Sequence, residues 1–447
     1  MKEWVVKMSE LALFGGNPAV TAELAEKNVR PFMSREAIDK TMQMMMDGEI
    51  SVSPSVRLLE ERFAQWLGVR HVLALCNGTT AIQAALFASG VCPGDEVIVP
   101  SYTFWGGVAP VMAIQAKPVF CDVDEETYNL SPSAIEECIT EKTKAIVPVH
   151  VWGNPCDMPS IMALARKNGI AVVEDCAHAH GATCGGKKAG SFGDASMFSL
   201  QGSKVMRAGE GGLLVTDDSE IFDRATALGH YERLSAMDPG NRYSRYSLTG
   251  LGFKHRIHPL GAQLALSDLE SLDVMNDLRD NQGQRLESLL TGLPFISFQK
   301  VLPDSRRLYS YHYVRYHAEG LGGLSMQVFL YALKAEGLTV GLCGYGRLHE
   351  APFFTESAPC GERWHGSAVD HLPQKPPPKL PVTERLREET FLLAPRFETD
   401  CPDLVAAYAE ACHKVSKNRD ALLKFERENP PDAQMMETAR GSSVVLI

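Results

Sequence analysis

The stretch "ASMFSLQGSKVMRAGEGGLLVTDD" (Ala195–Asp218) places a single lysine, Lys204, between two short apolar runs. The outer parts, "ASMFSL" and "GGLLVTDD", have the length and composition of buried β-strands. The segment between them carries a serine before the lysine, and a glutamate with two glycines after it. A surface loop needs none of these residues, whereas a lysine that carries a covalent cofactor does.

Similar apolar runs precede this stretch and predict the fold class. From about residue 70 they alternate with helical patterns, at His71–Leu75, Asp95–Pro100, Lys117–Val123, Lys144–Val151 and Ile170–Asp175. Buried runs with helices between several of them predict an α/β fold with a mostly parallel sheet covered on both faces. Ligands of such sheets bind at the carboxyl ends of the strands. We therefore expect the chemistry in the residues that follow each run.

The pattern changes after about residue 265. Leu264–Leu290 predicts a long helix with Gly283 as its weak point, and Tyr309–Tyr316 alternates like a strand. We expect a smaller α+β domain here, with an extended proline-rich loop at Pro373–Pro381. The predicted division is an N-terminal segment (1–33), a large domain (34–265), a small domain (266–428) and a tail (429–447).

Composition excludes several classes of protein. The net charge is -11 and no Lys/Arg run is present, so neither nucleic acid nor a membrane surface is an expected partner. No apolar run reaches the length of a membrane span, and the N-terminus lacks a signal-peptide pattern. None of the 11 cysteines forms a C-x-x-C pair, so we expect no metal site and reduced thiols in the cytoplasm.

Candidate site residues follow the predicted strands. Asp175 ends "IAVVED" and could hold a protonated pyridine nitrogen or cap the next helix. In "CNGTTAIQAAL", Gly78, Thr79 and Thr80 open a helix, where backbone N–H groups and hydroxyls form a phosphate cradle or an ordinary N-cap. Ser199 could add a hydroxyl to the same phosphate.

Aromatic and imidazole side chains complete the set. Phe104 and Trp105 follow the Asp95–Pro100 run and could stack on a flat cofactor or pack in the core. His178, in "EDCAHAHGA", could donate to a phenolate oxygen or be a buried core histidine. Phosphate cradle, aromatic ring, pyridine partner and lysine are together what pyridoxal 5′-phosphate (PLP) requires.

These motifs resemble the DegT/StrS family of sugar aminotransferases, which belongs to the fold-type I class of PLP enzymes. The similarity runs from about Leu11 to about Phe397. The stretches that carry it are "NGTTAIQAAL", "EDCAHAHGA", "FSLQGSKVMRAGEGG", "LHEAPFF" and "LPVTERLREETFLLAP". The resemblance implies a large domain with a seven-stranded sheet and a smaller α+β domain.

The resemblance also implies roles for individual residues. Lys204 would form the internal aldimine with PLP, and Asp175 would pair with its ring nitrogen. Thr79, Thr80 and Ser199 would contact the phosphate, Phe104 would stack on the ring, and Trp105 is the alternative. His349 would reach the acceptor substrate from the small domain, as would Arg347. His178 stands where many members have glutamine.

The segment "GFKHRIHPLGAQLA" departs from the family pattern, because Lys254 replaces a common asparagine. In this fold class the neighbouring subunit completes the active site, so we expect a homodimer in which Lys254 and Arg256 reach the partner's cofactor or substrate. The "AHAHG" and "GEGG" motifs most resemble members that aminate cyclitol ketones such as scyllo-inosose.

The expected activity is transfer of an amino group from glutamine or glutamate to a keto-cyclitol or keto-sugar. Three alternatives stay open at this stage. One is a PLP-dependent dehydratase or aromatising enzyme similar to the aminohydroxybenzoate synthases. The second is an aminotransferase for nucleotide-linked keto-sugars, and the third is a non-catalytic PLP-binding sensor.

Overall fold

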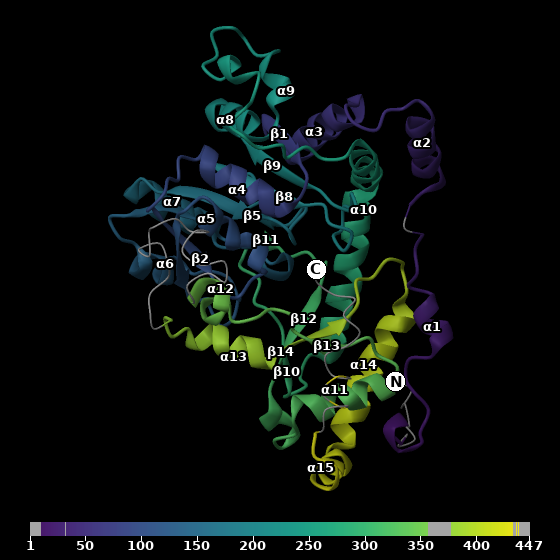
Figure 1. Cartoon of the computed structure of the whole chain (residues 1–447). Coiled ribbons are helices and arrows are strands. Elements are labelled where there is room, and N and C mark those ends of the chain that lie inside the picture. Colours follow the sequence, from purple (N-terminus) through teal and green to yellow (C-terminus); the bar gives the residue numbers. More distant parts are fainter. Residues whose placement is uncertain (1–9, 32, 356–376, 432–434, 436, 438–447) are drawn as a thin grey trace.

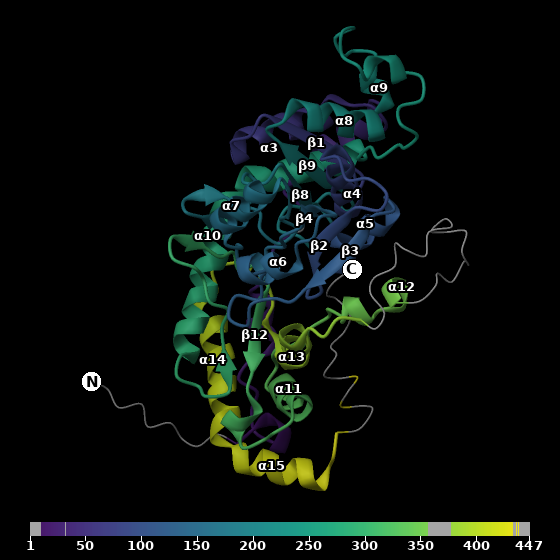
Figure 2. The same ribbon diagram turned by 90° about the vertical axis from the view of Figure 1, so that its left-hand side faces the viewer.

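A computed structural model describes residues 10–31, 33–355, 377–431, 435 and 437. A larger part built on the central sheet lies above a smaller part in the view of Figure 1, and the long helix α10 (Pro259–Leu290) runs between them. Turned by 90°, the smaller part again lies wholly to one side of the sheet (Figure 2). Among the described residues, no helix is both long and apolar enough to cross a membrane.

The central sheet has seven strands in the order β1-β9-β8-β5-β4-β2-β3. Only β9 runs antiparallel to its neighbours, so the mostly parallel α/β sheet predicted from the sequence is confirmed. The carboxyl ends of β1, β2, β5 and β8 consequently meet at one edge. The strands are β1 (His71–Leu75), β2 (Glu96–Pro100), β3 (Lys117–Cys121), β4 (Thr143–Ile146), β5 (Ala171–Asp175), β8 (Ala195–Ser199) and β9 (Gly212–Thr216).

Helices cover both faces of this sheet, which is why its strands are almost uninterrupted apolar runs. One face packs against α4 (Gly78–Ala88), α5 (Ala109–Ala113) and α8 (Ser219–Gly229). The other face packs against α3 (Pro54–Leu67), α6 (Pro132–Cys138), α7 (Met158–Asn168) and the first half of α10. Every residue of β2, β8 and β9 is buried.

The smaller part contains an antiparallel sheet in the order β10-β12-β14-β13. Its core also takes in Leu11 and Val20, so the described N-terminal residues pack here. Its elements are β10 (Ile296–Ser297), β12 (His312–Tyr316), β13 (Gly341–Leu342), β14 (Thr390–Ala394), α11 (Met326–Ala335), α14 (Pro402–Lys417) and α15 (Arg419–Glu428).

Shorter elements connect or flank these two parts. A small sheet in the order β11-β6-β7 joins residues from both. The remaining elements are α1 (Ala22–Glu26), α2 (Arg35–Met46), α9 (Tyr231–Leu234), α12 (Pro352–Thr355), α13 (Pro381–Glu389), β6 (Thr183–Cys184), β7 (Lys187–Lys188) and β11 (Ser305–Arg306).

Helix α10 belongs to both cores. Ala262 and Ala265 pack under the large sheet, whereas Leu286 and Leu290 lie in the core of the smaller part. The predicted boundary after residue 265 falls inside this helix, and the four-part division stays a prediction. Residues 373–376 of the predicted proline-rich loop and most of the predicted tail lie outside the described residues.

Gly283, the predicted weak point of the long helix, has a packing role in α10. A Cβ atom at this position would lie 2.3 Å from Cδ1 of Tyr309, closer than real Cβ atoms approach other heavy atoms. The missing side chain therefore lets the Tyr309 ring lie against the helix. Tyr309 precedes β12 and the residues that reach the cavity described below.

Gly283→Ala is expected to lower the free energy of unfolding by about 1–3 kcal/mol, the usual range for overpacking. Alanine normally favours a helix over glycine by about 1 kcal/mol, so the expected sign is opposite to that of helix propensity. Urea denaturation measures the change. Ser288→Ala, at an exposed position of the same helix, is the control and should leave stability nearly unchanged. A Gly283→Ala protein at least as stable as the parent would contradict the packing role.

Candidate active site

A cavity of about 210 Å³ lies at the edge where the carboxyl ends of the parallel strands meet. Its walls come from the start of α4, the loop after β2, the ends of β5 and β8, and one residue of the smaller part. The lining residues are Asn77, Gly78, Thr79, Thr103, Phe104, Trp105, Gly106, Gly107, Val149, Asp175, Ala177, His178, Met197, Ser199, Gln201, Lys204, Glu210 and Tyr345.

The start of α4 forms one end of the cavity. Asn77 caps this helix by accepting a hydrogen bond from the N–H of Thr80 at 2.8 Å. The first N–H groups of a helix have no partner within it, so those of Gly78 and Thr79 can bind an anion. Ser199 lies beside them, because a Cβ atom added to Gly78 would be 3.2 Å from the Cβ of Ser199. The Thr80 hydroxyl instead donates to the Asn77 carbonyl at 2.9 Å and does not line the cavity.

Asp175 provides a buried carboxylate at the end of β5. Its Oδ1 accepts a hydrogen bond from Ala177 N–H at 3.0 Å. Burial raises the pKa of the Asp175 carboxyl, against the opposing effects of that N–H and of Lys204. A Cβ atom on Gly107 would lie 2.8 Å from Oδ2, so the loop after β2 closes directly over this oxygen. A cation beside the carboxylate favours its ionised form.

His178 lies next to Asp175 with its imidazole in the neutral state. Burial, and then the charge of Lys204, lower the pKa of His178 well below its ordinary value. Among the described residues its Nδ1 has no hydrogen-bond partner. The ring is stacked on Trp152, with centroids 5.2 Å apart and an interplanar angle of 8°. A neutral imidazole has one N–H to donate to a ligand.

Two aromatic side chains stand on the loop after β2. Phe104 and Trp105 both line the cavity, with ring centroids 5.1 Å apart. Trp105 is 52% exposed, whereas Phe104 is half-buried. Both side chains predicted as stacking candidates are therefore at the cavity, and the choice between them stays open.

Lys204 enters the same cavity from the loop between β8 and β9. A tight turn holds its backbone, because Lys204 N–H donates to the Gln201 carbonyl at 2.8 Å. The Gln201 side chain accepts from Ser203 N–H at 2.7 Å. The Lys204 Nζ lies 5.7 Å from the centre of the Tyr311 ring. The structure thus brings the lysine, Asp175 and His178 to one cavity.

Besides Thr80, the predicted site residues His349, Arg347, Lys254 and Arg256 do not line this cavity. His349 is buried, and its Nδ1 pairs with Ser101 Oγ at 2.7 Å. Lys254 and Arg256 line another hollow of about 220 Å³, next to the surface formed by Ile50. The loop that bears them nevertheless passes the end of β1, the strand that leads into the helix start described above.

Sequence reasoning missed several lining residues. Gln201 and Glu210 belong to the stretch that singled out Lys204, so their nearness in the chain was a usable signal. Tyr345 comes from the smaller part of the chain, 141 positions after the lysine by the printed numbering, and no motif pointed to it. Its hydroxyl has no hydrogen-bond partner among the described residues.

The cavity fits PLP by the chemistry of its walls. The helix start with Thr79 and Ser199 suits a phosphate, and Asp175 suits a protonated ring nitrogen. The buried Nδ1 of His178 has no hydrogen-bond partner among the described residues, which indicates that a ligand supplies a polar group here. An amine, aromatic faces and glycines that admit a flat ring complete the match.

Comparison with known proteins gives the same assignment. Residues 31–390 match the DegT/DnrJ/EryC1/StrS aminotransferase family. A candidate L-glutamine:3-amino-2,3-dideoxy-scyllo-inosose aminotransferase from Streptoalloteichus tenebrarius is 34% identical over 428 residues, 93% of this chain and 99% of that protein.

Two solved structures share the fold. DesI in the presence of its TDP-sugar product is 28% identical, with a TM-score of 0.75 and coverage of 94% of this chain and 100% of that one. 3-Amino-5-hydroxybenzoic acid synthase is 27% identical, with a TM-score of 0.71 and coverage of 86% and 98%.

Gly107→Ala is expected to weaken PLP binding about tenfold, because the added methyl group displaces the Asp175 carboxylate or the loop above it. Titration of the cofactor-free protein with PLP, followed by absorbance, measures the change. Gly346→Ala is the matched control, since no atom of the described residues lies within 4 Å of its new Cβ. Equal PLP affinity in both variants would show that the loop does not press on Asp175.

Proposed function

The chain belongs to the DegT/DnrJ/EryC1/StrS aminotransferase family and is a PLP-dependent aminotransferase, and from this premise we propose that it transfers an amino group from glutamine to a keto-cyclitol. The observation that carries the site assignment is the meeting of Lys204, Asp175 and the start of α4 in one cavity. Glutamate is the alternative donor, and a keto-sugar is the alternative acceptor.

Bound PLP supplies an electron-withdrawing ring that stabilises negative charge on the carbon from which the donor loses its proton. The Lys204 amine would hold the cofactor covalently and, as a free amine, would take the proton from the donor's α-carbon. Asp175 would hold the proton on the ring nitrogen, and the neutral His178 would donate to the phenolate oxygen. Gly78, Thr79 and Ser199 would bind the phosphate, while Phe104 or Trp105 would cover the ring and exclude water.

The charges of the cavity favour a polyol ketone as acceptor. No arginine lines the cavity among the described residues, so this chain places no diphosphate clamp there. Arg347, a possible cation for such a clamp, instead pairs with Glu388 at 2.5 Å. Hydroxyl-rich ligands need neutral donors and acceptors, which Gln201 and Tyr345 supply at the wall.

The relatives point to the same acceptor class and preserve the alternatives. One relative is named as a cyclitol aminotransferase, and the match to this chain covers 99% of that protein's length. The TDP-sugar product of DesI supports nucleotide-linked sugars as the second candidate. The likeness to 3-amino-5-hydroxybenzoic acid synthase keeps an aromatising or dehydrating reaction as the third.

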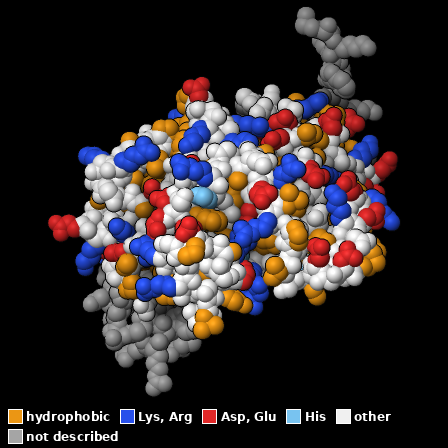
Figure 3. All heavy atoms as spheres, turned by 90° about the horizontal axis from the view of Figure 1, so that it is seen from above, with side chains coloured by type: hydrophobic (Ala, Val, Ile, Leu, Met, Phe, Trp, Pro, Cys, Tyr) orange, Lys and Arg blue, Asp and Glu red, His pale blue; other side chains and the backbone are white. Residues whose placement is uncertain are grey.

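A homodimer with shared active sites completes the proposal. Exposed apolar side chains gather on α2 and just after it, at Met42, Met45, Met46, Ile50 and Val52. A contiguous apolar patch of this kind is typical of a protein interface. The top of the larger part also shows apolar side chains among charged ones (Figure 3).

This apolar surface adjoins the cationic loop. Ile50 lines the same hollow as Lys254 and Arg256, and Val52 lines an adjoining one. Cys76 N–H donates to the His255 carbonyl at 2.6 Å, which fixes the loop two residues before Gly78. A second copy packed on this surface would bring the two cations toward the phosphate end of its partner's cavity.

Amination assays test the activity and its lysine together. With glutamine and a scyllo-inosose-like ketone, the protein should release 2-oxo acid, and borohydride should trap the cofactor on Lys204. Lys204→Ala should abolish both, whereas Lys167→Ala, an exposed lysine of α7, should retain both. Trapping on a different lysine would overturn the site assignment. Turnover only with nucleotide-linked keto-sugars would overturn the cyclitol assignment.

Mixed dimers test the shared site. Lys254→Ala and Lys204→Ala should each be poorly active alone, but exchanged subunits should regain up to about half of the wild-type activity per heterodimer, since one of its two sites is intact. Size-exclusion chromatography checks that a dimer forms, and differently tagged subunits verify the exchange. No recovery in verified heterodimers would contradict the contribution of Lys254 to its neighbour.

A further inference from the structure

The peptide bond that precedes the proposed catalytic lysine is held by side chains from the smaller part of the chain. We propose that Arg396 and Tyr311 are positioning residues that fix the Ser203–Lys204 peptide and, through it, the place of the Lys204 amine in the cavity. This inference rests on the proposed function, because it takes Lys204 as the lysine that holds the cofactor.

Both polar groups of this peptide have partners. The Ser203 carbonyl accepts a hydrogen bond from Arg396 Nη1 at 2.7 Å, and the Lys204 N–H donates to the Gln201 carbonyl at 2.8 Å. A peptide held at its oxygen and at its nitrogen cannot rotate about its flanking bonds without losing one of these contacts. The direction in which the lysine side chain leaves the backbone is thereby set.

Tyr311 supports the same peptide from the segment before β12. Its hydroxyl lies 3.2 Å from Ser203 Oγ and 3.4 Å from the Ser203 carbonyl oxygen. Its ring meets the His178 ring edge to face at 4.9 Å, and the Lys204 Nζ is 5.7 Å from its centre. One side chain therefore contacts both the lysine loop and the His178 imidazole.

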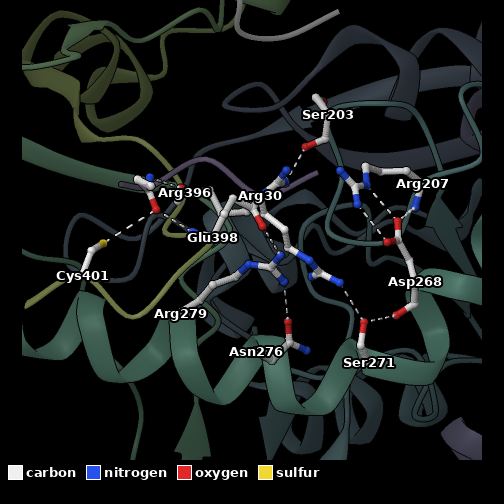
Figure 4. A network of polar contacts seen from close by, with 11 residues as sticks. Arg30, Ser203, Arg207, Asp268, Ser271, Asn276, Arg279, Arg396, Glu398 and Cys401 are labelled. Atoms are coloured by element: carbon white, nitrogen blue, oxygen red, sulfur yellow. Dashed lines mark hydrogen bonds and ion pairs between the residues drawn. The ribbon is translucent and has the colours of Figure 1, made fainter. Parts of the chain in front are cut away.

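A network of ion pairs fixes Arg396 itself (Figure 4). Arg396 Nε donates to Glu398 Oε1 at 2.5 Å, and the other oxygen of Glu398 accepts from Arg279 at 2.8 Å. Asn28 accepts from the backbone N–H of Glu398 at 2.7 Å. The Arg279 side chain is 4% exposed. The network is therefore anchored to a buried residue of α10 and not to a side chain in solvent.

The anchor continues to the other side of the site. Arg279 Nη1 donates to Asn276 Oδ1 at 3.5 Å, and the Asn276 amide donates to the His180 carbonyl at 2.8 Å. His180 lies two residues beyond His178. The network that holds Arg396 thus also holds the loop after β5, so the lysine loop and the loop that carries His178 share one support.

The role assigned to Arg396 is mechanical and predicts a specific kinetic signature. Lysine has a flexible four-carbon stem, so the anchored backbone is the main restraint on its amine. A displacement of about 1 Å at a reacting group can cost on the order of a hundredfold in rate. A loosened peptide should therefore lower kcat and leave the KM for the donor nearly unchanged.

Arg396→Met tests this, because it keeps the length of the side chain and removes the donor. We expect kcat for the half-reaction with glutamine to fall at least tenfold, with KM within about twofold of wild type. The fraction of cofactor that borohydride traps on Lys204 should fall as well. Arg396→Lys, which keeps the charge and one donor, should restore part of both. Arg385→Met is the control, because that arginine is exposed and pairs with Glu125 at the surface.

The structural alternative is that Arg396 only stabilises the fold. In that case Arg396→Met would lower the unfolding temperature of the cofactor-free protein while kcat and trapping stay at the wild-type level, and the inference would be overturned. A raised KM with unchanged kcat would overturn it too, because it would assign Arg396 to substrate binding.

A double-mutant cycle separates one shared peptide from two independent effects. Tyr311→Phe keeps the ring beside His178 and removes the hydroxyl near Ser203. If both side chains act on the same peptide, the losses of kcat in the double variant should be less than additive. Full additivity would overturn the joint role. Absence of trapped cofactor on Lys204 in the wild-type protein would instead refute the proposed function, which makes the two failures distinguishable.

Discussion

The buried carboxylate of Asp175 at the end of β5 is the group on which the arrangement of the site depends. Its backbone is paired on both sides, since its N–H donates to Pro148 and its carbonyl accepts from His150. The preceding residue, Glu174, points away from Asp175 along the strand and accepts from His150, from three backbone N–H groups and from Ser196. Burial alone would raise the pKa of Glu174, but these hydrogen bonds lower it overall. The Glu174 carboxylate is therefore charged and fully hydrogen-bonded, and it fixes the strand end that carries Asp175.

The sequence predicted the parts of this architecture that depend on local pattern. Buried parallel strands are continuous apolar runs, so β1, β5 and β8 were recognisable, and the residues that follow them are those that line the cavity. Contacts between distant segments leave no local pattern. Tyr345 and the pairing of Ser101 with His349 depend on how the smaller part docks on the sheet, which no periodicity encodes. Thr80 is a local case instead, because its hydroxyl donates to the Asn77 carbonyl within its own helix start.

The two parts of the chain are mechanically joined rather than merely adjacent. Helix α10 contributes apolar side chains to both cores, and Gly283 allows the segment before β12 to lie against it. That segment carries Tyr311 to the lysine loop, and Ser310 donates to the His178 carbonyl at 3.1 Å. A movement of the smaller part would therefore be transmitted to both walls of the cavity.

Charge balance supports the proposal that a second copy of the chain completes the site. The cavity wall carries two carboxyl groups, Asp175 and Glu210, and one amine, Lys204, while His178 is neutral. In bound PLP, a protonated ring nitrogen would offset Asp175, and the phosphate, with nearly two negative charges, would face the N-terminus of α4. A helix terminus supplies the equivalent of about half a positive charge. In the proposed dimer, the remaining compensation would come from cations outside this wall. Lys254 and Arg256 lie on a loop tied to the end of β1 but open into a separate hollow beside an exposed apolar surface. Dimerisation through that surface is the arrangement that would make these cations useful to a phosphate.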